Sequence, residues 1–125
     1  MGGYKKARLI MKLIYIAGPY RAENEFGVYM NIHRAKMIAL EVWRMGAAVI
    51  CPHTNTSFLG GAISKDDFKI WLKGDLVILR RCDALFAMDG WTTSKGTQEE
   101  LALCIKLEKP VFYTLEKLKD WLDDS

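Results

Sequence analysis

Two acidic residues, Asp75 and Glu100, occupy positions where a carboxyl group could take part in chemistry. Over about 65–81 the apolar residues recur with helical spacing, and Asp75 falls in the middle of that apolar stripe. A carboxylate on an apolar face is unfavourable unless it is partnered or protonated. Two interpretations stay open. Asp75 is either a buried group that caps a loop or pairs with an arginine, or a group whose pKa is raised by burial, suited to holding or donating a proton.

Glu99 and Glu100 are expected in the first turn of a helix over about 97–107. The helix dipole favours ionised carboxylates there, so helix stabilisation alone explains both residues. Glu100 lies beside the apolar edge of Leu101 and Cys104, which predicts that its side chain points toward the sheet. One ionised and one protonated carboxyl group is also the division of labour in covalent glycosyl transfer.

Two loops carry groups that could hold an anion. Arg21 ends the segment Gly18-Pro19-Tyr20-Arg21 after a strand, and Ser94-Lys95-Gly96 precedes a helix N-terminus. Neither segment is a Walker loop or a GxGxxG fingerprint, so a nucleoside triphosphate or a dinucleotide is not predicted. Arg21 as an ordinary exposed loop residue remains open.

Strand patterns alternate with helical patterns along the chain. Strands are expected at 13–17, 47–51, 84–88 and 111–113, and helices at about 28–45, 64–81, 97–107 and 115–122. Ser64 and Asp67 resemble a capping box, Gly46 is placed to end a helix, and 53–63 is expected to be a loop. These βαβ units predict an α/β fold with one doubly wound, mostly parallel sheet of four or five strands. Helices cover both faces, as in flavodoxin-like and Rossmann-like folds, and the ligand crevice lies beyond the carboxyl ends of the strands.

Composition limits the other possibilities. A chain of 125 residues that is 50% hydrophobic suits one domain, expected at 12–125 after a flexible leader at 1–11. A net charge of +3 is too small to predict a nucleic acid polymer as partner, although it favours a small anionic ligand. The longest apolar runs fall short of the roughly 20 residues that span a bilayer, so no membrane partner is predicted. Three cysteines without CxxC spacing indicate reduced core thiols in a cytoplasmic protein and no zinc site.

Three segments together resemble the nucleoside 2-deoxyribosyltransferase superfamily. They are Tyr15-Ile16-Ala17-Gly18-Pro19-Tyr20-Arg21, then Asp75-Leu76-x-x-Leu79-x-x-x-Asp83, then Ser94-x-Gly96-x-x-x-Glu100-Leu101. The chain is especially similar to the small DUF4406-type branch and to the 2'-deoxynucleoside 5'-phosphate N-hydrolases. The resemblance covers about 12–113.

The resemblance implies a role for each matching residue. Glu100 is the nucleophile that attacks the anomeric carbon of the sugar, Asp75 contacts the sugar and transfers a proton to the leaving base, and Tyr15 orients the nucleophile. In the nucleotide hydrolase branch, Arg21 and Ser94 bind the 5'-phosphate. The candidate substrate-binding residues are Gly18, Pro19, Arg21, His53, Asn55, Ser94 and Gly96.

Some positions depart from that pattern. Gly18-Pro19 replaces a glycine-serine pair, so one phosphate donor is absent, and Glu99 stands where a non-acidic residue is usual. His53 matches a histidine near the base, although a loop histidine is more often structural. Aromatic residues in the crevice loops, Tyr20, Phe58 and Trp91, are candidates either for stacking on a base or for ordinary packing.

The implied function is cleavage of the N-glycosidic bond of a (deoxy)nucleoside or its 5'-monophosphate through a covalent glycosyl-glutamate intermediate. Water then gives hydrolysis, and a second base gives transfer. No cofactor or metal is implied, and the implied assembly is a homodimer or higher homo-oligomer, for which Trp43, Trp71 and several methionines supply apolar area. The alternative is a catalytically inactive nucleotide-binding or sensing module.

Overall fold

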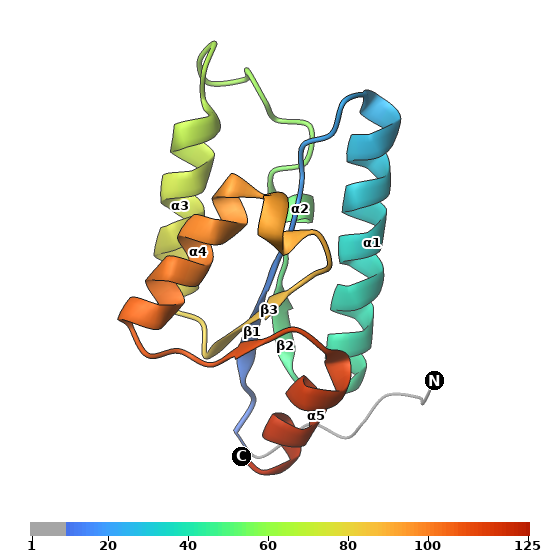
Figure 1. The fold of residues 1–125 in the computed structure, drawn as a ribbon, viewed down its shortest axis with the longest axis vertical. Coiled ribbons are helices and arrows are strands. Elements are labelled where there is room, and N and C mark those ends of the chain that lie inside the picture. The colour runs from blue at the N-terminus through green and yellow to red at the C-terminus, as the bar shows by residue number, and fades with distance from the viewer. Residues whose placement is uncertain (1–9) are drawn as a thin grey trace.

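The computed structural model describes residues 10–125, so the predicted leader at 1–11 falls outside the described residues except for its last two. The sheet has four strands in the described part of the chain, all parallel, in the order β2-β1-β3-β4. The strands are β1 (Leu13–Ala17), β2 (Ala48–Ile50), β3 (Ala84–Ala87) and β4 (Val111–Phe112). The predicted α/β fold with a parallel sheet is therefore confirmed (Figure 1).

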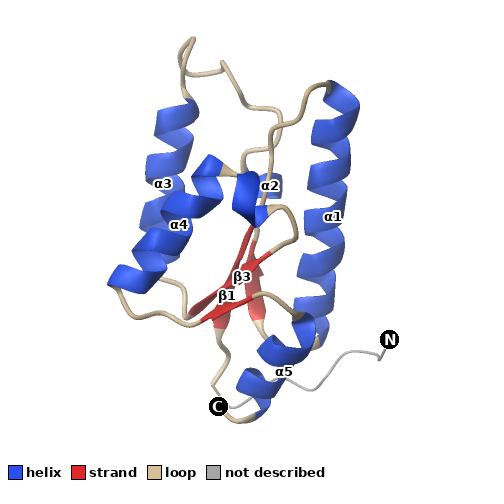
Figure 2. Cartoon of the chain, in the orientation of Figure 1, coloured by secondary structure: helices blue, strands red, loops and turns tan. Residues whose placement is uncertain are grey.

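Helices lie on both faces of this sheet (Figure 2). The helices are α1 (Glu25–Arg44), α2 (Pro52–Asn55), α3 (Phe68–Arg80), α4 (Lys95–Lys106) and α5 (Leu115–Asp123), with a 3-10 turn η1 (Trp91–Thr93). One core cluster joins α1 and α5 to one face of the sheet, and a second joins α3 and α4 to the other. Because side chains alternate along a strand, Ile14 and Ile16 enter the first cluster whereas Tyr15 and Ala17 enter the second.

Helix α1 begins at Glu25, three residues before the expected start, and ends at Arg44, one residue before the expected end. Asn24 caps α1 by accepting a hydrogen bond from the Gly27 N–H, at 2.8 Å. Gly46 follows the last turn of that helix with φ +86°, a conformation that glycine adopts without steric cost. No helix in the part of the chain that the structure describes is long and apolar enough to cross a membrane.

The capping box expected at Ser64 and Asp67 is wrong, because α3 begins only at Phe68. Asp67 stands at the N-cap position, but its carboxylate accepts hydrogen bonds from the Ile63 N–H and the Trp71 indole N–H instead of capping the helix. The loop expected over 53–63 also contains the short helix α2, which has proline in its first turn.

Helix α4 begins at Lys95, two residues before the expected start, with Ser94 as its N-cap. Glu99 and Glu100 therefore lie in the second turn, and the expectation of a first-turn position is wrong. The field of a helix dipole falls off within the first turn, so it does little to keep these carboxyl groups ionised.

Candidate active site

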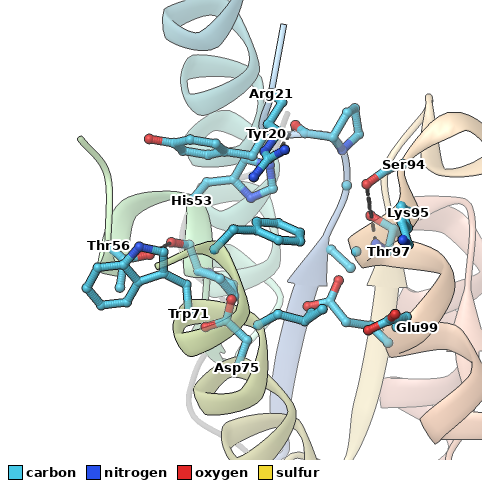
Figure 3. A pocket seen from close by; sticks show the side chains of 18 of the residues that line it. Tyr20, Arg21, His53, Thr56, Trp71, Asp75, Ser94, Lys95, Thr97 and Glu99 are labelled. Atoms are coloured by element: carbon cyan, nitrogen blue, oxygen red, sulfur yellow. Dashed lines mark hydrogen bonds between the residues drawn. The ribbon is translucent and has the colours of Figure 1, made fainter. Parts of the chain in front are cut away.

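A cleft of about 980 Å³ opens beyond the carboxyl end of β1. Its walls come from the loop after β1, from α2, from α3 and from the start of α4. Figure 3 shows Trp71 and Asp75 on one side of the cleft and Ser94, Lys95 and Thr97 on the other. This is the edge of the sheet where parallel α/β folds place their ligands. Six of the ten predicted site residues line this cleft from the segments that follow β1, β2 and β3: Gly18, Pro19, Arg21, His53, Ser94 and Gly96.

Glu100 lies at the base of the cleft with only 7% of its surface exposed. Its carboxyl group accepts a hydrogen bond from the Tyr15 hydroxyl. Tyr15 is fully buried on the face of β1 that packs against α3 and α4, so its ring is fixed by the core and its hydroxyl is fixed by Glu100. Strand alternation thus explains why this tyrosine faces the acidic residue.

The pKa of Glu100 is raised to about 8. Burial is the main cause, the negative charges of Asp75 and Glu99 add to it, and the hydrogen bond from Tyr15 partly opposes it. Burial also raises the pKa of Asp75 to about 6. At neutral pH these pKa values keep Glu100 mostly protonated and Asp75 mostly ionised. The sequence favoured the reverse assignment, which relied on Glu100 being in the first turn of its helix.

Asp75 is half-buried on α3 and lines the cleft opposite α4. Among the described residues, no hydrogen-bond or ion-pair partner is found for its carboxylate. Phe68, Trp71 and Leu72 belong to the same apolar stripe of α3 as Asp75, and all of them line the cleft. These findings favour the functional interpretation of Asp75 over a capping or ion-pairing role.

The end of the cleft beside β1 carries the groups that could hold an anion. The Arg21 guanidinium lies 4.0 Å from the centre of the Phe68 ring, a cation–π contact that keeps this exposed side chain at the cleft. Across the cleft, Ser94 caps α4 by accepting from the Thr97 N–H at 3.3 Å and from the Thr97 hydroxyl at 2.9 Å. With both acceptor positions used, the Ser94 hydroxyl has its own hydrogen left to donate.

Gly18 and Pro19 line the cleft and also hold it together. A side chain at Gly18 would come within 2.9 Å of the Met88 Cβ, so glycine is required by close packing against the residue that follows β3. Pro19 in turn contacts Gly90, where a Cβ would lie 2.9 Å from the proline ring. The loops after β1 and β3 are thereby pressed together at one end of the cleft.

Of the two candidate substrate-binding residues after β2, His53 lines the cleft and Asn55 does not. His53 lines the cleft, but its Nε2 hydrogen bonds to the Pro19 carbonyl at 2.8 Å and its ring packs 5.8 Å from that of Tyr20. Burial lowers the pKa of His53. Asn55 is exposed at the end of α2 and does not line the cleft, so the structure does not bring it to the site.

Only some of the aromatic residues considered for base stacking line the cleft. Tyr20 lines the cleft, and its hydroxyl accepts a hydrogen bond from the Phe58 N–H at 2.9 Å. Trp91 packs against Tyr113 with 4.9 Å between ring centres and does not line the cleft. Trp71 lines the cleft instead, a position that sequence reasoning assigned to an interface.

Within residues 10–125 there is no group of three or more histidine, cysteine, aspartate or glutamate side chains arranged to hold a metal ion. The three cysteines in this range are free and buried.

The fold resembles that of a solved 2-deoxyribosyltransferase from the psychrotolerant bacterium Bacillus psychrosaccharolyticus. The two chains are 25% identical with a TM-score of 0.56, and the match covers 79% of this chain and 69% of the other. That enzyme is described as a biocatalyst for the synthesis of antiviral and antitumoral nucleosides. The chain matches no curated protein.

The DUF4406-type branch named above stays a resemblance only. A family model does match residues 12–114, which is most of the chain. The chain belongs to the family described as a domain of unknown function, DUF7768.

Proposed function

We propose that this protein cleaves the N-glycosidic bond of a (deoxy)nucleoside or its 5'-monophosphate, with Glu100 as the nucleophile. The observation that carries the proposal is the Glu100 carboxyl group, buried at the base of the cleft and fixed by the Tyr15 hydroxyl, with Asp75 facing the same cleft from another helix. The fold match to a 2-deoxyribosyltransferase supports an enzyme of the transferase kind. The cleft of about 980 Å³ has room for a nucleoside or nucleotide.

In the first step the ionised Glu100 carboxylate attacks the anomeric carbon and forms a glycosyl ester. The bond from that carbon to the base nitrogen breaks, its electron pair stays with the base, and protonated Asp75 delivers a proton to the base. In the second step water attacks the anomeric carbon, Glu100 leaves as a carboxylate, and Asp75 takes up a proton from the water. A second free base in place of water gives transfer.

The reactive form of the site needs an ionised Glu100 and a protonated Asp75. Between the pKa of Asp75, about 6, and that of Glu100, about 8, the two carboxyl groups together hold one proton. That proton is mostly on Glu100, so the reactive form is a minor fraction of the protein. The dependence of kcat/KM on pH is therefore expected to be bell-shaped, with apparent pKa values near 6 and 8 that describe Glu100 and Asp75 as a coupled pair. Developing positive charge on the sugar favours the ionised form of Glu100 as the reaction proceeds.

The test is a panel of nucleosides, deoxynucleosides and their 5'-monophosphates, with and without a second free base, followed by chromatography of the released base. Glu100→Gln keeps an acceptor for Tyr15 but is not a nucleophile, and we expect it to lower base release at least about 1000-fold. Glu116→Gln, which changes an exposed glutamate on α5, is the matched control. Undiminished release by Glu100→Gln would overturn the proposal, and binding without release from any substrate would show the binding module.

A second arm tests the proton donor. Asp75→Asn is expected to lose activity on an ordinary purine deoxynucleoside but to retain most of it on the N7-methylated analogue, whose base leaves without needing a proton. Asp75→Asn also removes a charge that raises the pKa of Glu100, so the remaining activity should rise with pH along a single limb below pH 8. Equal losses on both substrates would contradict proton donation by Asp75.

We also propose a homo-oligomer. Trp43 and the methionines Met30 and Met37 are exposed on α1, which leaves apolar surface uncovered in one copy of the chain. Sedimentation equilibrium tests this, and a monomer at high protein concentration would contradict it.

A further inference from the structure

Three consecutive carbonyl groups in the loop after β1 each accept a hydrogen bond from a side chain of another element. His53 on α2 donates to the Pro19 carbonyl at 2.8 Å. Asn31 on α1 donates to the carbonyls of both Tyr20 and Arg21, at 3.1 and 3.2 Å. Asn31 and His53 are 7% and 5% exposed, so these bonds are shielded from water.

The chemistry of the partners fixes which atoms donate. A carbonyl oxygen only accepts, so His53 carries its hydrogen on Nε2 and Asn31 presents its NH₂ group to the loop. The guanidinium of Arg34 only donates, and it bonds to the Asn31 side-chain oxygen. The positive charge of Arg34 also lowers the pKa of His53, in addition to the larger effect of burial. Arg34, Asn31 and His53 therefore form one polar support behind the loop.

This support determines what the loop presents to the cleft. Asn31 is not part of the cleft wall, so the carbonyls of Tyr20 and Arg21 point toward α1 and away from a bound ligand. The Arg21 side chain lies on the Phe68 ring at the cleft, and Ser94 and Lys95 lie on the other side of the cleft (Figure 3). An anionic group there meets a guanidinium and a hydroxyl donor without the repulsion of free carbonyl oxygens.

We propose that Asn31, together with His53, is a positioning residue that holds the loop at Pro19–Arg21 so that Arg21 binds the anionic part of the substrate. This inference rests on the proposed function and adds that a nucleoside 5'-monophosphate is preferred over the free nucleoside. Neither residue touches the reacting atoms, so their effect falls on binding of the phosphate and not on the chemical step.

The test compares Asn31→Asp with the wild-type chain. A carboxylate of nearly the same shape cannot donate to the two carbonyls, although it can still pair with Arg34 and so support the fold. Asn24→Asp is the matched control, because it makes the same change of charge on the same helix at an N-cap position where aspartate works equally well. Thermal unfolding of each variant reports on the fold.

Calorimetric binding of a deoxynucleoside 5'-monophosphate and of its parent deoxynucleoside is measured with each protein, and kcat and KM for both are measured separately. Asn31→Asp should weaken monophosphate binding at least tenfold, with a matching rise in KM and little change in kcat. Affinity for the parent nucleoside should change less than twofold, and Asn24→Asp should resemble wild type. His53→Gln, which keeps an N–H donor, should retain more of the monophosphate preference than His53→Leu.

Equal losses for both ligands in Asn31→Asp would overturn the inference and show a merely structural residue. A wild-type chain that binds both ligands equally would also overturn it, whatever the catalytic result. A chain that prefers the monophosphate but releases no base would leave the inference intact while the proposed function fails.

Discussion

The Tyr15 hydroxyl connects the sheet to the proposed nucleophile. Its ring is fully buried, so Tyr15→Phe removes one hydrogen bond to Glu100 and keeps the packing. That hydrogen bond lowers the pKa of Glu100, which burial has raised to about 8. Its loss makes the ionised nucleophile rarer and less well oriented.

Tyr15→Phe should therefore lower kcat/KM for base release by roughly 10- to 100-fold, by analogy with the loss of one hydrogen bond to a charged group. The alkaline limb of the pH profile should move to higher pH, because the pKa of Glu100 rises. Initial rates between pH 5 and 9.5 check both effects. An unchanged profile would mean that Tyr15 supports the core and not the carboxylate.

At the level of elements, Ser94 has two roles at the N-terminus of α4. Ser94 caps the helix with its oxygen and has a hydrogen left to donate into the cleft. Ser94→Ala should lose both roles and destabilise the protein by about 1 kcal/mol. Ser94→Asp should preserve the cap, and hence the melting temperature, but repel a 5'-phosphate. Urea denaturation and monophosphate binding, measured on both variants, separate the two roles, and normal binding by Ser94→Asp would exclude Ser94 from the anion site.

The contact between the loops after β1 and β3 is a second feature at this level. Gly90 has φ +92°, and an added Cβ would lie 2.9 Å from the ring of Pro19. Gly90→Ala should destabilise the protein by more than about 1 kcal/mol, because both backbone strain and the contact oppose the methyl group. Gly74→Ala is the control, since a Cβ at that helical position meets nothing within 4 Å. Equal stability of the two variants would show that the loops separate easily.

For the whole molecule, the buried Glu100 makes stability depend on pH. Its pKa rises from an ordinary value of 4.5 to about 8 on folding, so between these values the native state holds a proton that the unfolded state has lost. Stability therefore falls as the pH rises toward 8 and levels off above it. The pKa of His53 is lowered from 6.5, so its titration makes stability fall as the pH falls. This opposite effect is confined to pH values below about 6.5.

Urea denaturation at pH 6.5, 7.25 and 8 should show decreasing stability for the wild-type chain and a flatter dependence for Glu100→Gln. The difference between the two proteins isolates this carboxyl group from Asp75, whose pKa of about 6 places its titration lower. Parallel curves would show that Glu100 is ionised in the native state throughout.

Most of the fold could be predicted from the sequence because its signals are local. The apolar run at β1 and the helical periodicity of α1 depend only on neighbouring residues, and both elements form close to where they were expected. The start of α3 was mispredicted because Asp67 bonds to Ile63 and Trp71, a choice that a spacing rule does not detect.

The sequence by itself determined the parallel α/β architecture and the edge of the sheet where Asp75 and Glu100 belong, since hydrophobic pattern and strand direction fix both. Only the tertiary structure decided which carboxyl group keeps its proton, because the pKa depends on burial and on charges from distant segments. It likewise decided that His53 supports a loop and that Asn31, which the sequence did not single out, bonds to that loop. Hydrogen-bond partners across elements are set by packing in three dimensions, which the spacing of residues along the chain does not specify.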